Sequence, residues 1–262
     1  MKLRSIGERG SQVFNQNLKI TRLGKSGRID EAIKIFSQMA QRNTVTYNSM
    51  ISAYAKNGRV GNARQLFDQM PQRNLVSWNS MIAGYVHNDR VEEAYRLFVD
   101  MPDRDLYSWT LMITCYTRNS ELEKARELFN LLPDKRDTMP SRSVVSWNAM
   151  LAAYVRDHQI DKAIKIFRDM PEMDSVSWTT MINGYVRVGK LDEARQLLNR
   201  MPYRNIAAQT AMMSGYVQNG RMDEASQIFN QIAIYDVVCW NTLIAGYAQC
   251  GEMVEALSLF KK

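Results

Sequence analysis

The sequence is poor in the residues that build catalytic and metal centres. It contains 3 cysteines and 2 histidines among 262 residues, and it has no Cys-x-x-Cys or His-x-Glu motif. The cysteines, Cys115, Cys239 and Cys250, are odd in number, which indicates reduced thiols rather than disulfides or metal ligands. His87 and His158 have no candidate partner ligands nearby, so we expect turn or surface histidines. The sequence therefore predicts no metal, no cofactor and no catalysis.

Long apolar runs and helix breakers are also scarce. No run of 18 apolar residues occurs, which argues against a membrane-spanning helix. Only 6 prolines and 13 glycines are present, so many helices can form. Hydrophobic residues make up 45% and charged residues 23%, the composition of a folded chain. The net charge of +7 permits a polyanionic partner without requiring one.

Aromatic residues recur at an interval of 31 residues, which indicates an internal repeat. The aromatic column is Tyr47, Trp78, Trp109, Trp147, Trp178 and Trp240, with Gln209 in the place of one member. A tyrosine column follows in step: Tyr54, Tyr85, Tyr116, Tyr154, Tyr185, Tyr216 and Tyr247. An alanine column completes the pattern: Ala63, Ala94, Ala125, Ala163, Ala194, Ala225 and Ala256.

Each repeat predicts two helices joined by a short polar turn. In one unit, apolar residues from Val76 to Tyr85 and again from Val91 to Met101 recur at helical spacing. The turn between them is His87-Asn88-Asp89, and the proline after Met101 stops the second helix. Small residues predict close approach of the two helices within one hairpin: Ala53, Gly84, Ala153, Gly184, Gly215 and Gly246. Because a single hairpin cannot bury its own apolar face, we expect an all-α, right-handed α-solenoid of about eight helix-turn-helix repeats.

The repeat fixes the expected organisation of the chain. We predict an N-terminal leader at residues 1–11 and a repeat array at residues 12–262. The expected units are 12–42, 43–73, 74–104, 105–142, 143–173, 174–204, 205–235 and a truncated 236–262. The fourth unit carries a seven-residue insertion between Leu131 and Arg142, which we expect to be a loop at the edge of the solenoid.

One face of each first helix is polar in an unusual way. Counting from three residues before the aromatic column, positions 2, 5, 9 and 13 lie within about 80° of the helix circumference, away from the core positions 4, 7, 8 and 11. Position 5 contains only Asn or Thr: Asn17, Asn48, Asn79, Thr110, Asn148, Thr179, Thr210 and Asn241. A face that is merely solvated would favour Lys, Glu, Gln and Arg, so this column predicts contact with a ligand.

Three further columns accompany position 5. Counted from position 1, each repeat ends one residue after the bounds given above, and this last residue is short and polar: Asn43, Asn74, Asp105, Ser143, Asp174, Asn205 and Asp236. Position 2 is mostly apolar: Val45, Val76, Tyr107, Val145, Val176 and Val238, with Phe14 and Ala207 departing. Position 13 is often cationic: Lys25, Lys56, Arg118, Arg156 and Arg187, alongside His87, Gln218 and Gln249.

Each of these columns also has a structural explanation. The last residue suits the N-cap of the next helix, position 2 suits packing between helices, and cations suit a helix C-terminus. Together, however, the columns give each hairpin an apolar clamp, a polar group and often a cation. Such a set can stack a base, hydrogen-bond its edge and neutralise its phosphate, which suits single-stranded nucleic acid.

The pattern VSWNxMIxGY…G…EAxxLFxxMP resembles the pentatricopeptide repeat family of plant organelles over about residues 12–262. The 31-residue spacing and the Met-Pro ending resemble the short repeats of proteins that guide C-to-U editing. This resemblance implies binding of single-stranded RNA, one nucleotide per repeat, read by position 5 with the last residue of the unit. It also implies an organelle, and the basic residues 1–29, with Glu8 as the single acid, are compatible with mitochondrial or chloroplast import.

The family's pairing rules imply a target. Asn with Asp implies uridine, Asn with Asn a pyrimidine, Thr with Asn adenine and Thr with Asp guanine. Thr110 with Ser143 implies a purine, and Asn241 alone implies a pyrimidine. The implied target of the eight units is 5′-YYURUAGY-3′.

The sequence departs from the family in two respects. Ala207 and Gln209 weaken the expected clamp and packing of the seventh unit. The zinc deaminase found at the C-terminus of editing members is missing, so chemistry would need a deaminase or another RNA-processing enzyme acting in trans. The alternatives are a protein-binding scaffold of the tetratricopeptide kind and a truncated product of a longer editing-factor gene.

Overall fold

Helices of two lengths alternate along the chain. The computed structural model describes residues 2–132, 143–232 and 235–261, with side chains from residue 11 onward. Within these ranges sixteen α-helices and no strands are present. The first helices of the hairpins are α1 (Lys2–Lys25), α3 (Thr44–Lys56), α5 (Leu75–His87), α7 (Leu106–Arg118), α9 (Val144–Arg156), α11 (Ser175–Arg187), α13 (Ile206–Gln218) and α15 (Val237–Gln249). The second helices are α2 (Ile29–Gln38), α4 (Val60–Asp68), α6 (Val91–Asp100), α8 (Leu122–Leu131), α10 (Ile160–Asp169), α12 (Leu191–Arg200), α14 (Met222–Gln231) and α16 (Met253–Phe260).

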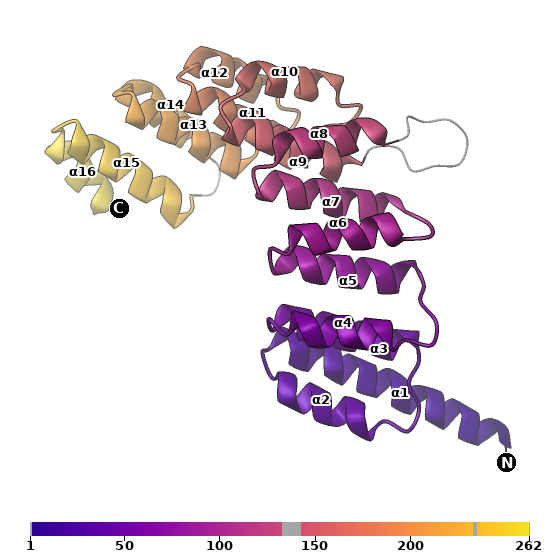
Figure 1. Cartoon of the computed structure of the whole chain (residues 1–262). Helices are drawn as coiled ribbons and strands as arrows, with labels where there is room; N and C mark the ends of the chain where they lie inside the picture. Colours follow the sequence, from indigo (N-terminus) through magenta and orange to yellow (C-terminus); the bar gives the residue numbers. More distant parts are fainter. Residues whose placement is uncertain (1, 133–142, 233–234, 262) are drawn as a thin grey trace. The chain divides into compact units, whose positions relative to one another are not determined.

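Each first helix packs on the second helix that follows it, which gives eight hairpins (Figure 1). The hairpins fall into two compact units, Met1–Ser143 with α1–α8 and Val144–Lys262 with α9–α16. The predicted all-α helical-repeat solenoid is confirmed. Helix α1 begins at Lys2, so most of the segment that we assigned to a leader is helical. Most of the predicted edge loop, at 133–142, lies outside the described residues.

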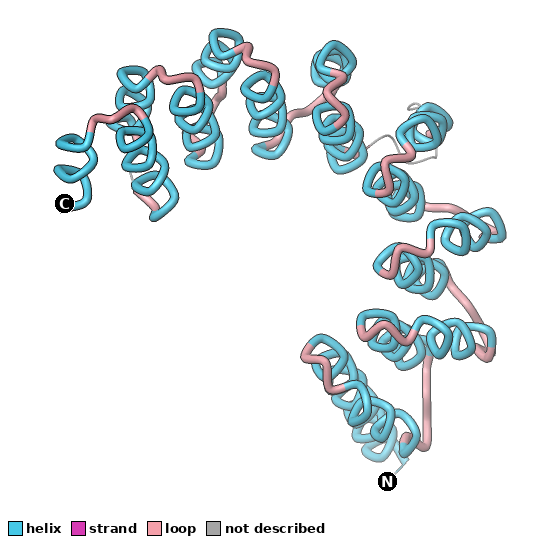
Figure 2. Tube along the Cα trace, turned by 60° about the vertical axis from the view of Figure 1, so that its left-hand side comes forward, coloured by secondary structure: helices cyan, strands magenta, loops and turns pink. Residues whose placement is uncertain are grey.

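Within each unit the first helices form one continuous layer (Figure 2). Inside each unit, each first helix contacts the next first helix, and each second helix contacts the first helix of the next hairpin. Among the described residues the backbones of the second helices do not pack against one another. The layer of first helices is therefore the continuous element, and we call its surface away from the second helices the first-helix face.

The turn inside each hairpin needs a left-handed backbone at its second residue. Glycine supplies it at Gly27, Gly58, Gly189, Gly220 and Gly251. Asp89, Ser120 and His158 adopt the same conformation, with φ of 55°, 60° and 57°. His158 is thus a turn residue, as predicted. The neighbouring Asn57 donates from Nδ2 to the carbonyl oxygens of Ala53 at 2.7 Å and of Gly24, in the preceding hairpin, at 3.0 Å, so the turn also ties successive first helices together.

The aromatic column forms the contact between successive hairpins. Trp78 lies edge-on to Phe67 of the preceding second helix, with ring centroids 5.1 Å apart. Equivalent pairs form at Phe36–Tyr47, Phe98–Trp109, Phe167–Trp178 and Phe229–Trp240. Aromatic pairs of this geometry contribute about 0.5–1.5 kcal/mol beyond the burial of their area. In the seventh unit Gln209 is 8% exposed, and Leu198 stands in place of the facing phenylalanine, so both members of the pair are lost together.

The predicted core positions are confirmed by burial. At position 7 the methionines are 0–1% exposed: Met50, Met81, Met112, Met150, Met181 and Met212. Position 8, occupied by Ile51, Ile82, Ile113, Leu151, Ile182 and Met213, is also fully buried. The high methionine content of the chain therefore serves the core.

The small-residue column has a different role from the one predicted. A Cβ on Gly84 would meet the Ala55 Cβ at 2.8 Å, and one on Gly215 would meet Val186 at 2.7 Å. Ala55 and Val186 belong to the preceding first helices. The small residues therefore allow close approach between neighbouring hairpins, because the first helices need this space to form their layer.

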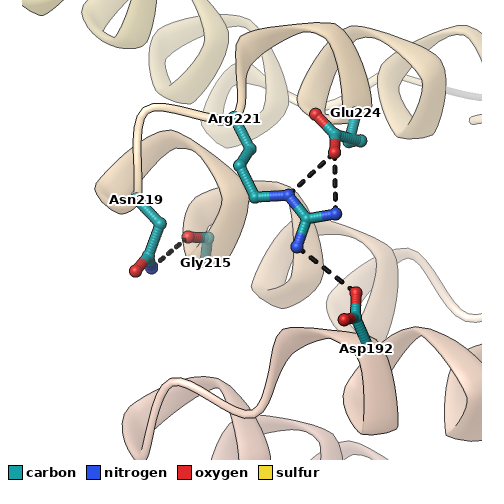
Figure 3. A network of polar contacts seen from close by, with 5 residues as sticks. All are labelled: Asp192, Gly215, Asn219, Arg221 and Glu224. Atoms are coloured by element: carbon teal, nitrogen blue, oxygen red, sulfur yellow. Dashed lines mark hydrogen bonds and ion pairs between the residues drawn. The ribbon is translucent and has the colours of Figure 1, made fainter.

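Ion pairs join the starts of the second helices. In Figure 3, Arg221 donates to Glu224 of its own helix and reaches Asp192 of the preceding second helix, with Nη1–Oδ1 at 3.3 Å. Arg59 and Asp30 form the same pair in the first unit, at 2.9 Å. Both pairs are largely exposed, so each adds little stability. They connect second helices whose backbones do not pack against each other.

Cys115 and Cys239 are buried, Cys250 is exposed, and all three are free thiols. Burial raises the pKa of Cys115 to about 11, so this thiol stays protonated. Among the described residues, no helix combines the length and the apolar character needed to cross a bilayer.

Candidate nucleic-acid interface

The last residue of each unit caps the first helix of the next hairpin. The side chains of Asn43, Asn74, Asp105, Asp174, Asn205 and Asp236 each accept a hydrogen bond from the backbone N–H three residues later. Such caps stabilise helices by about 1 kcal/mol. The structural explanation for this column is therefore correct, but it is not the whole of its role.

The same caps also hold the position-5 side chains of the preceding hairpin. Asn79 donates from Nδ2 to both carboxylate oxygens of Asp105, at 3.1 and 3.2 Å. Asn17 donates to the Oδ1 of Asn43 at 3.4 Å, and Asn148 donates to the Oδ1 of Asp174 at 3.0 Å. Thr110 and Ser143 lie 3.5 Å apart between their hydroxyl oxygens. Pairs that are 26 or 33 residues apart in sequence thus meet on the first-helix face.

The pairing with a carboxylate fixes the orientation of the Asn79 amide. A carboxylate only accepts hydrogen bonds, so Nδ2 must face Asp105 and Oδ1 must point away from it. Asn79 is 6% exposed, and its buried Oδ1 has no hydrogen-bond partner in the described part of the chain. The Oδ1 atoms of Asn17 and Asn48 are also buried and have no hydrogen-bond partner among the described residues. Buried acceptors are rarely left unpaired, and the fold itself supplies no donor to these three atoms.

The other position-5 residues are held differently. The Thr110 hydroxyl donates to the Leu106 carbonyl at 2.8 Å, which leaves its oxygen as an acceptor. Asn148 accepts a 2.7 Å hydrogen bond from Ser177, so its Oδ1 is already used. In the later repeats the expected partners do not meet directly. In the expected pair Thr179–Asn205, Thr179 is half-buried and Asn205 donates to Ser175 instead. In the expected pair Thr210–Asp236, Thr210 contacts the thiol of Cys239 at 3.2 Å. Asn241 is exposed on α15.

The apolar residues at position 2 are exposed. Val45, Val76, Tyr107, Val145, Val176 and Val238 are all 55–61% exposed. Packing between helices therefore does not explain this column. Exposed branched or aromatic side chains at one register, on helices that bury their other apolar positions, are available to stack on flat groups.

The cations at position 13 are exposed on the same face. Lys25, Lys56, Arg118, Arg156 and Arg187 are all exposed, one near the end of each of five first helices. Arg156 also lies 3.6 Å from Asp157, which partly neutralises it.

These columns meet in a groove in the first compact unit, Met1–Ser143. The groove has a volume of about 740 Å³. Predicted residues that line it are Val45, Asn48, Lys56, Val76, Asn79, Asp105 and Tyr107. Sequence reasoning missed Thr21, Ser49, Ser52, Ser80 and Ala83, which also line it. Apart from the cap Asp105, every lining residue belongs to a first helix, so the groove lies on the first-helix face.

The groove is lined mainly by neutral side chains. Among the described residues no group of three or more His, Cys, Asp or Glu is arranged to hold a metal ion. What the groove offers is amide and hydroxyl groups between apolar side chains, with a lysine at its edge. This arrangement can hold a flat, polar-edged, anionic ligand.

Comparison with protein families agrees with this geometry. Three PPR repeat families match successive segments: 20–44, 107–136, 176–206, 210–233 and 238–262 for one, 41–71 for the second, and 73–107 and 142–174 for the third. The chain belongs to the PPR repeat family. The matched families and the fold are those of a helical repeat.

Solved structures place the PPR chain in the same fold. It is similar to the crystal structure of the pentatricopeptide repeat protein PPR10 from maize, with a TM-score of 0.75 and 19% identity over 94% of this chain and 38% of that protein. A structure of PPR10 in complex with an 18-nt psaJ RNA element gives a TM-score of 0.72 and 18% identity, over 97% and 41%. The chain thus spans about two fifths of the length of that protein.

More distant similarity extends to another repeat class. A tetratricopeptide repeat protein from Parabacteroides merdae gives a TM-score of 0.51 and 12% identity over 90% of this chain and 99% of that one. No curated protein matches the sequence.

Proposed function

We propose that this chain binds single-stranded RNA on the first-helix face, one nucleotide per hairpin, with sequence selectivity set by position 5 and the last residue of the unit. The observation that carries the proposal is the pairing of position-5 amides with the caps of the next hairpins, at Asn17–Asn43, Asn79–Asp105 and Asn148–Asp174. The unpaired Oδ1 atoms of Asn17, Asn48 and Asn79 are buried, so we propose that these side chains shift on binding and accept N–H donors from a nucleobase edge. The similarity to PPR10, whose structure in complex with RNA has been solved, is consistent with this class of ligand.

The orientation of the Asn79 amide gives the base preference a physical basis. Its free Oδ1 can accept from the N3–H of uracil, whereas the N3 of cytosine is an acceptor and would face it without a hydrogen bond. Unpaired polar groups in a buried contact cost about 1–3 kcal/mol. We therefore propose uridine opposite the Asn79–Asp105 pair, and 5′-YYURUAGY-3′ for the eight hairpins.

Stacking and charge complete the proposed contact. The exposed Val45, Val76 and Tyr107 are spaced one per hairpin and can clamp successive bases, each contributing about 1–3 kcal/mol. The position-13 cations lie on the same face as the readers and can meet the phosphates. Single-stranded RNA suits this arrangement because its base edges are not already paired.

Binding to a labelled octamer of the proposed sequence tests the function. Filter binding at matched salt should give tighter binding to the octamer than to a scrambled octamer and to one with adenine in place of the third nucleotide. Equal affinity for all three would remove the sequence-selective proposal. A partner protein captured equally well with and without nuclease treatment, together with no RNA binding, would favour the protein-binding scaffold.

The cellular role follows from the family resemblance. We propose that the chain serves editing, processing or stabilisation of an organelle transcript, with any deaminase or other enzyme recruited in trans. The basic N-terminal segment supports mitochondrial localisation, with the chloroplast as the alternative. Crosslinking and sequencing of bound RNA from fractionated organelles would identify both the transcript and the compartment, and recovery of nuclear or cytosolic transcripts alone would contradict this role.

A further inference from the structure

The last two hairpins carry a second pocket, away from the first-helix face. It has a volume of about 590 Å³ and lies among α14, α15 and α16. The aromatic rings of Phe229, Tyr235, Trp240 and Tyr247 line it, together with Asn230 and Glu255. On α15, Trp240 and Tyr247 occupy core positions 4 and 11, which face away from Val238 and Asn241. The pocket is therefore separate from the proposed RNA contact.

An arginine of the chain itself lies at the corresponding place in the second hairpin. The guanidinium of Arg64 lies 5.8 Å from the centroid of the Phe67 ring and donates from Nε to the carboxylate of Asp68 at 2.9 Å. The hydrogen bond to Asp68 is the main cause that raises the pKa of Arg64, and the Tyr85 hydroxyl contributes. Arg64 thus combines a cation–π contact with a hydrogen bond and remains charged.

The repeat register maps this arginine onto Ser226. Phe67, Asp68 and Tyr85 correspond to Phe229, Asn230 and Tyr247, all of which line the pocket. The residues at the position of Ser226 in the other hairpins are Ile33, Arg64, Tyr95, Arg126, Ile164, Arg195 and Leu257. Serine is the smallest of the eight, so the pocket is the space that a long side chain occupies elsewhere.

A second truncation enlarges the same space. Ser258 corresponds to Arg96 of the third hairpin, and it lines the pocket from α16. The Ser226 hydroxyl is turned toward Tyr247, with 2.6 Å between Oγ and Oη. The aromatic rings are retained, while Ser226 and Ser258 stand where earlier hairpins have Arg64 and Arg96.

The charge of the pocket matches a cation. Glu255 contributes a carboxylate, and it has no ion-pair partner in the described part of the chain. Aromatic faces attract a guanidinium that lies within about 6 Å of the ring centroid. A planar guanidinium can stack on a ring and still donate to a carboxylate or an amide oxygen, which an ammonium group does less well.

We propose that this pocket binds the arginine side chain of a partner protein, in the place that the chain fills with its own Arg64 in the second hairpin. The partner would present an exposed arginine to α14 and α16. The guanidinium would stack against the rings of Phe229 and Tyr247 and donate to Glu255 and Asn230. Binding here leaves the first-helix face free for its own ligand.

Titration with two peptides tests the proposal on the full chain. The probes are acetyl-Gly-Arg-Gly-amide and its citrulline analogue, which has the same shape but no charge. The readout is the Trp240 indole resonance in ¹H–¹⁵N spectra, because this ring lines the pocket. The arginine peptide should shift the resonance in a saturable way with an affinity about fivefold higher than the citrulline peptide. Equal affinities would overturn the proposal.

Two variants locate the binding. Ser226→Arg should abolish the response by filling the pocket with the chain's own guanidinium, and Glu255→Gln should weaken binding about threefold. Thermal unfolding followed by circular dichroism checks that both variants fold, independently of RNA binding. A folded Ser226→Arg variant that still responds to the arginine peptide would place the binding elsewhere and overturn the assignment.

Discussion

The amide of Asn79 donates to the carboxylate of Asp105 at 3.1 Å, and the same carboxylate accepts the Ser108 backbone N–H at 2.9 Å. One side chain therefore caps α7 and orients the amide on the hairpin before it. Because of this shared role, the orientation of the Asn79 amide in one hairpin depends on the residue that caps the first helix of the next hairpin. The stability of the array and its selectivity can be separated only by choosing substitutions that keep one of the two functions.

Replacing Asn79 with alanine removes the reader and leaves the cap. We expect Asn79→Ala to weaken binding of the proposed octamer several-fold, since one hydrogen bond contributes about 0.5–1.5 kcal/mol. Discrimination against adenine at the third nucleotide should disappear, while preferences at the other positions remain. Filter binding to octamers varied at single positions measures both effects. Gln72→Ala, an exposed change away from the groove, is the control and should bind as the parent does.

Two substitutions at Asp105 should separate its functions. Asp105→Ala loses the cap, and we expect it to lower the free energy of unfolding by about 1 kcal/mol. Asp105→Asn retains a capping oxygen, so its stability should stay close to that of the parent. The asparagine no longer forces the orientation of the Asn79 amide, and uridine and cytosine should then bind with similar affinity. Urea unfolding and octamer binding are the measurements, and unchanged uridine preference in Asp105→Asn would contradict the argument.

The missing aromatic pair in the seventh unit can be rebuilt. Leu198→Phe and Gln209→Trp together restore the contact seen at Phe167–Trp178. We expect a favourable coupling energy of about 0.5–1.5 kcal/mol in a double-mutant cycle. Chemical denaturation of the parent, the two single variants and the double variant gives this value. Additive single effects would show that the two positions do not contact each other.

Phosphate contacts predict a salt dependence of binding. Lys56 is exposed and lines the groove. If Lys56 neutralises one phosphate, Lys56→Gln should reduce the slope of log affinity against log salt concentration by about 0.7. Base preference should not change, because a phosphate contact carries no sequence information. An unchanged slope would remove this lysine from the interface.

Acid should destabilise the second compact unit, Val144–Lys262, because two of its helix N-caps are aspartates. Burial opposes ionisation of Asp174, but hydrogen bonds from Ser177 and Asn148 outweigh it, and the pKa of Asp174 lies below its ordinary value. Hydrogen bonds from the thiol and the backbone N–H of Cys239 lower the pKa of Asp236 in the same way. The unfolded chain therefore binds protons more readily than the folded chain at these sites. The stability that they contribute is fully present above the ordinary aspartate pKa and is lost as the pH falls through the folded value.

The measurement is urea unfolding from pH 7 to about pH 3. A variant with Asp174→Asn and Asp236→Asn keeps capping oxygens that do not ionise. Its free energy of unfolding should fall less on acidification than that of the parent. An equal fall in both proteins would assign the acid sensitivity to other groups.

Much of the fold and of the candidate site follows from the sequence, since both rest on periodicity. The spacing of Trp78 and Trp109 predicts the hairpins, and the helix geometry predicts that Val76 and Asn79 share a face. The contact between Asn79 and Asp105 does not follow from spacing alone, because it depends on how hairpins stack. For the same reason the sequence predicts packing within a hairpin for Gly84, whereas in the structure it faces Ala55 of the preceding hairpin.

Other features were visible in the sequence but carried no evident meaning there. Arg73 and Arg104 precede the last residue of their units. In the structure Arg73 donates from Nε to the Phe67 carbonyl at 2.9 Å, and its guanidinium lies 4.8 Å from the centroid of that ring. Arg104 makes the same contacts with Phe98. The recurrence of this arginine is visible in the sequence and indicates a structural role. The carbonyl groups that it contacts, at the C-terminal end of a second helix, are identified only by the three-dimensional fold.

The double role of the cap residue has a consequence for how such arrays diversify. The start of a first helix favours short side chains with an oxygen acceptor at residues such as Asp105. The helix backbone therefore restricts the choice of amino acids at this position even without a ligand. Exchange between aspartate and asparagine preserves the helix start and alters the neighbouring amide. Related proteins can therefore change their preferred RNA sequence one nucleotide at a time, and each intermediate protein remains folded.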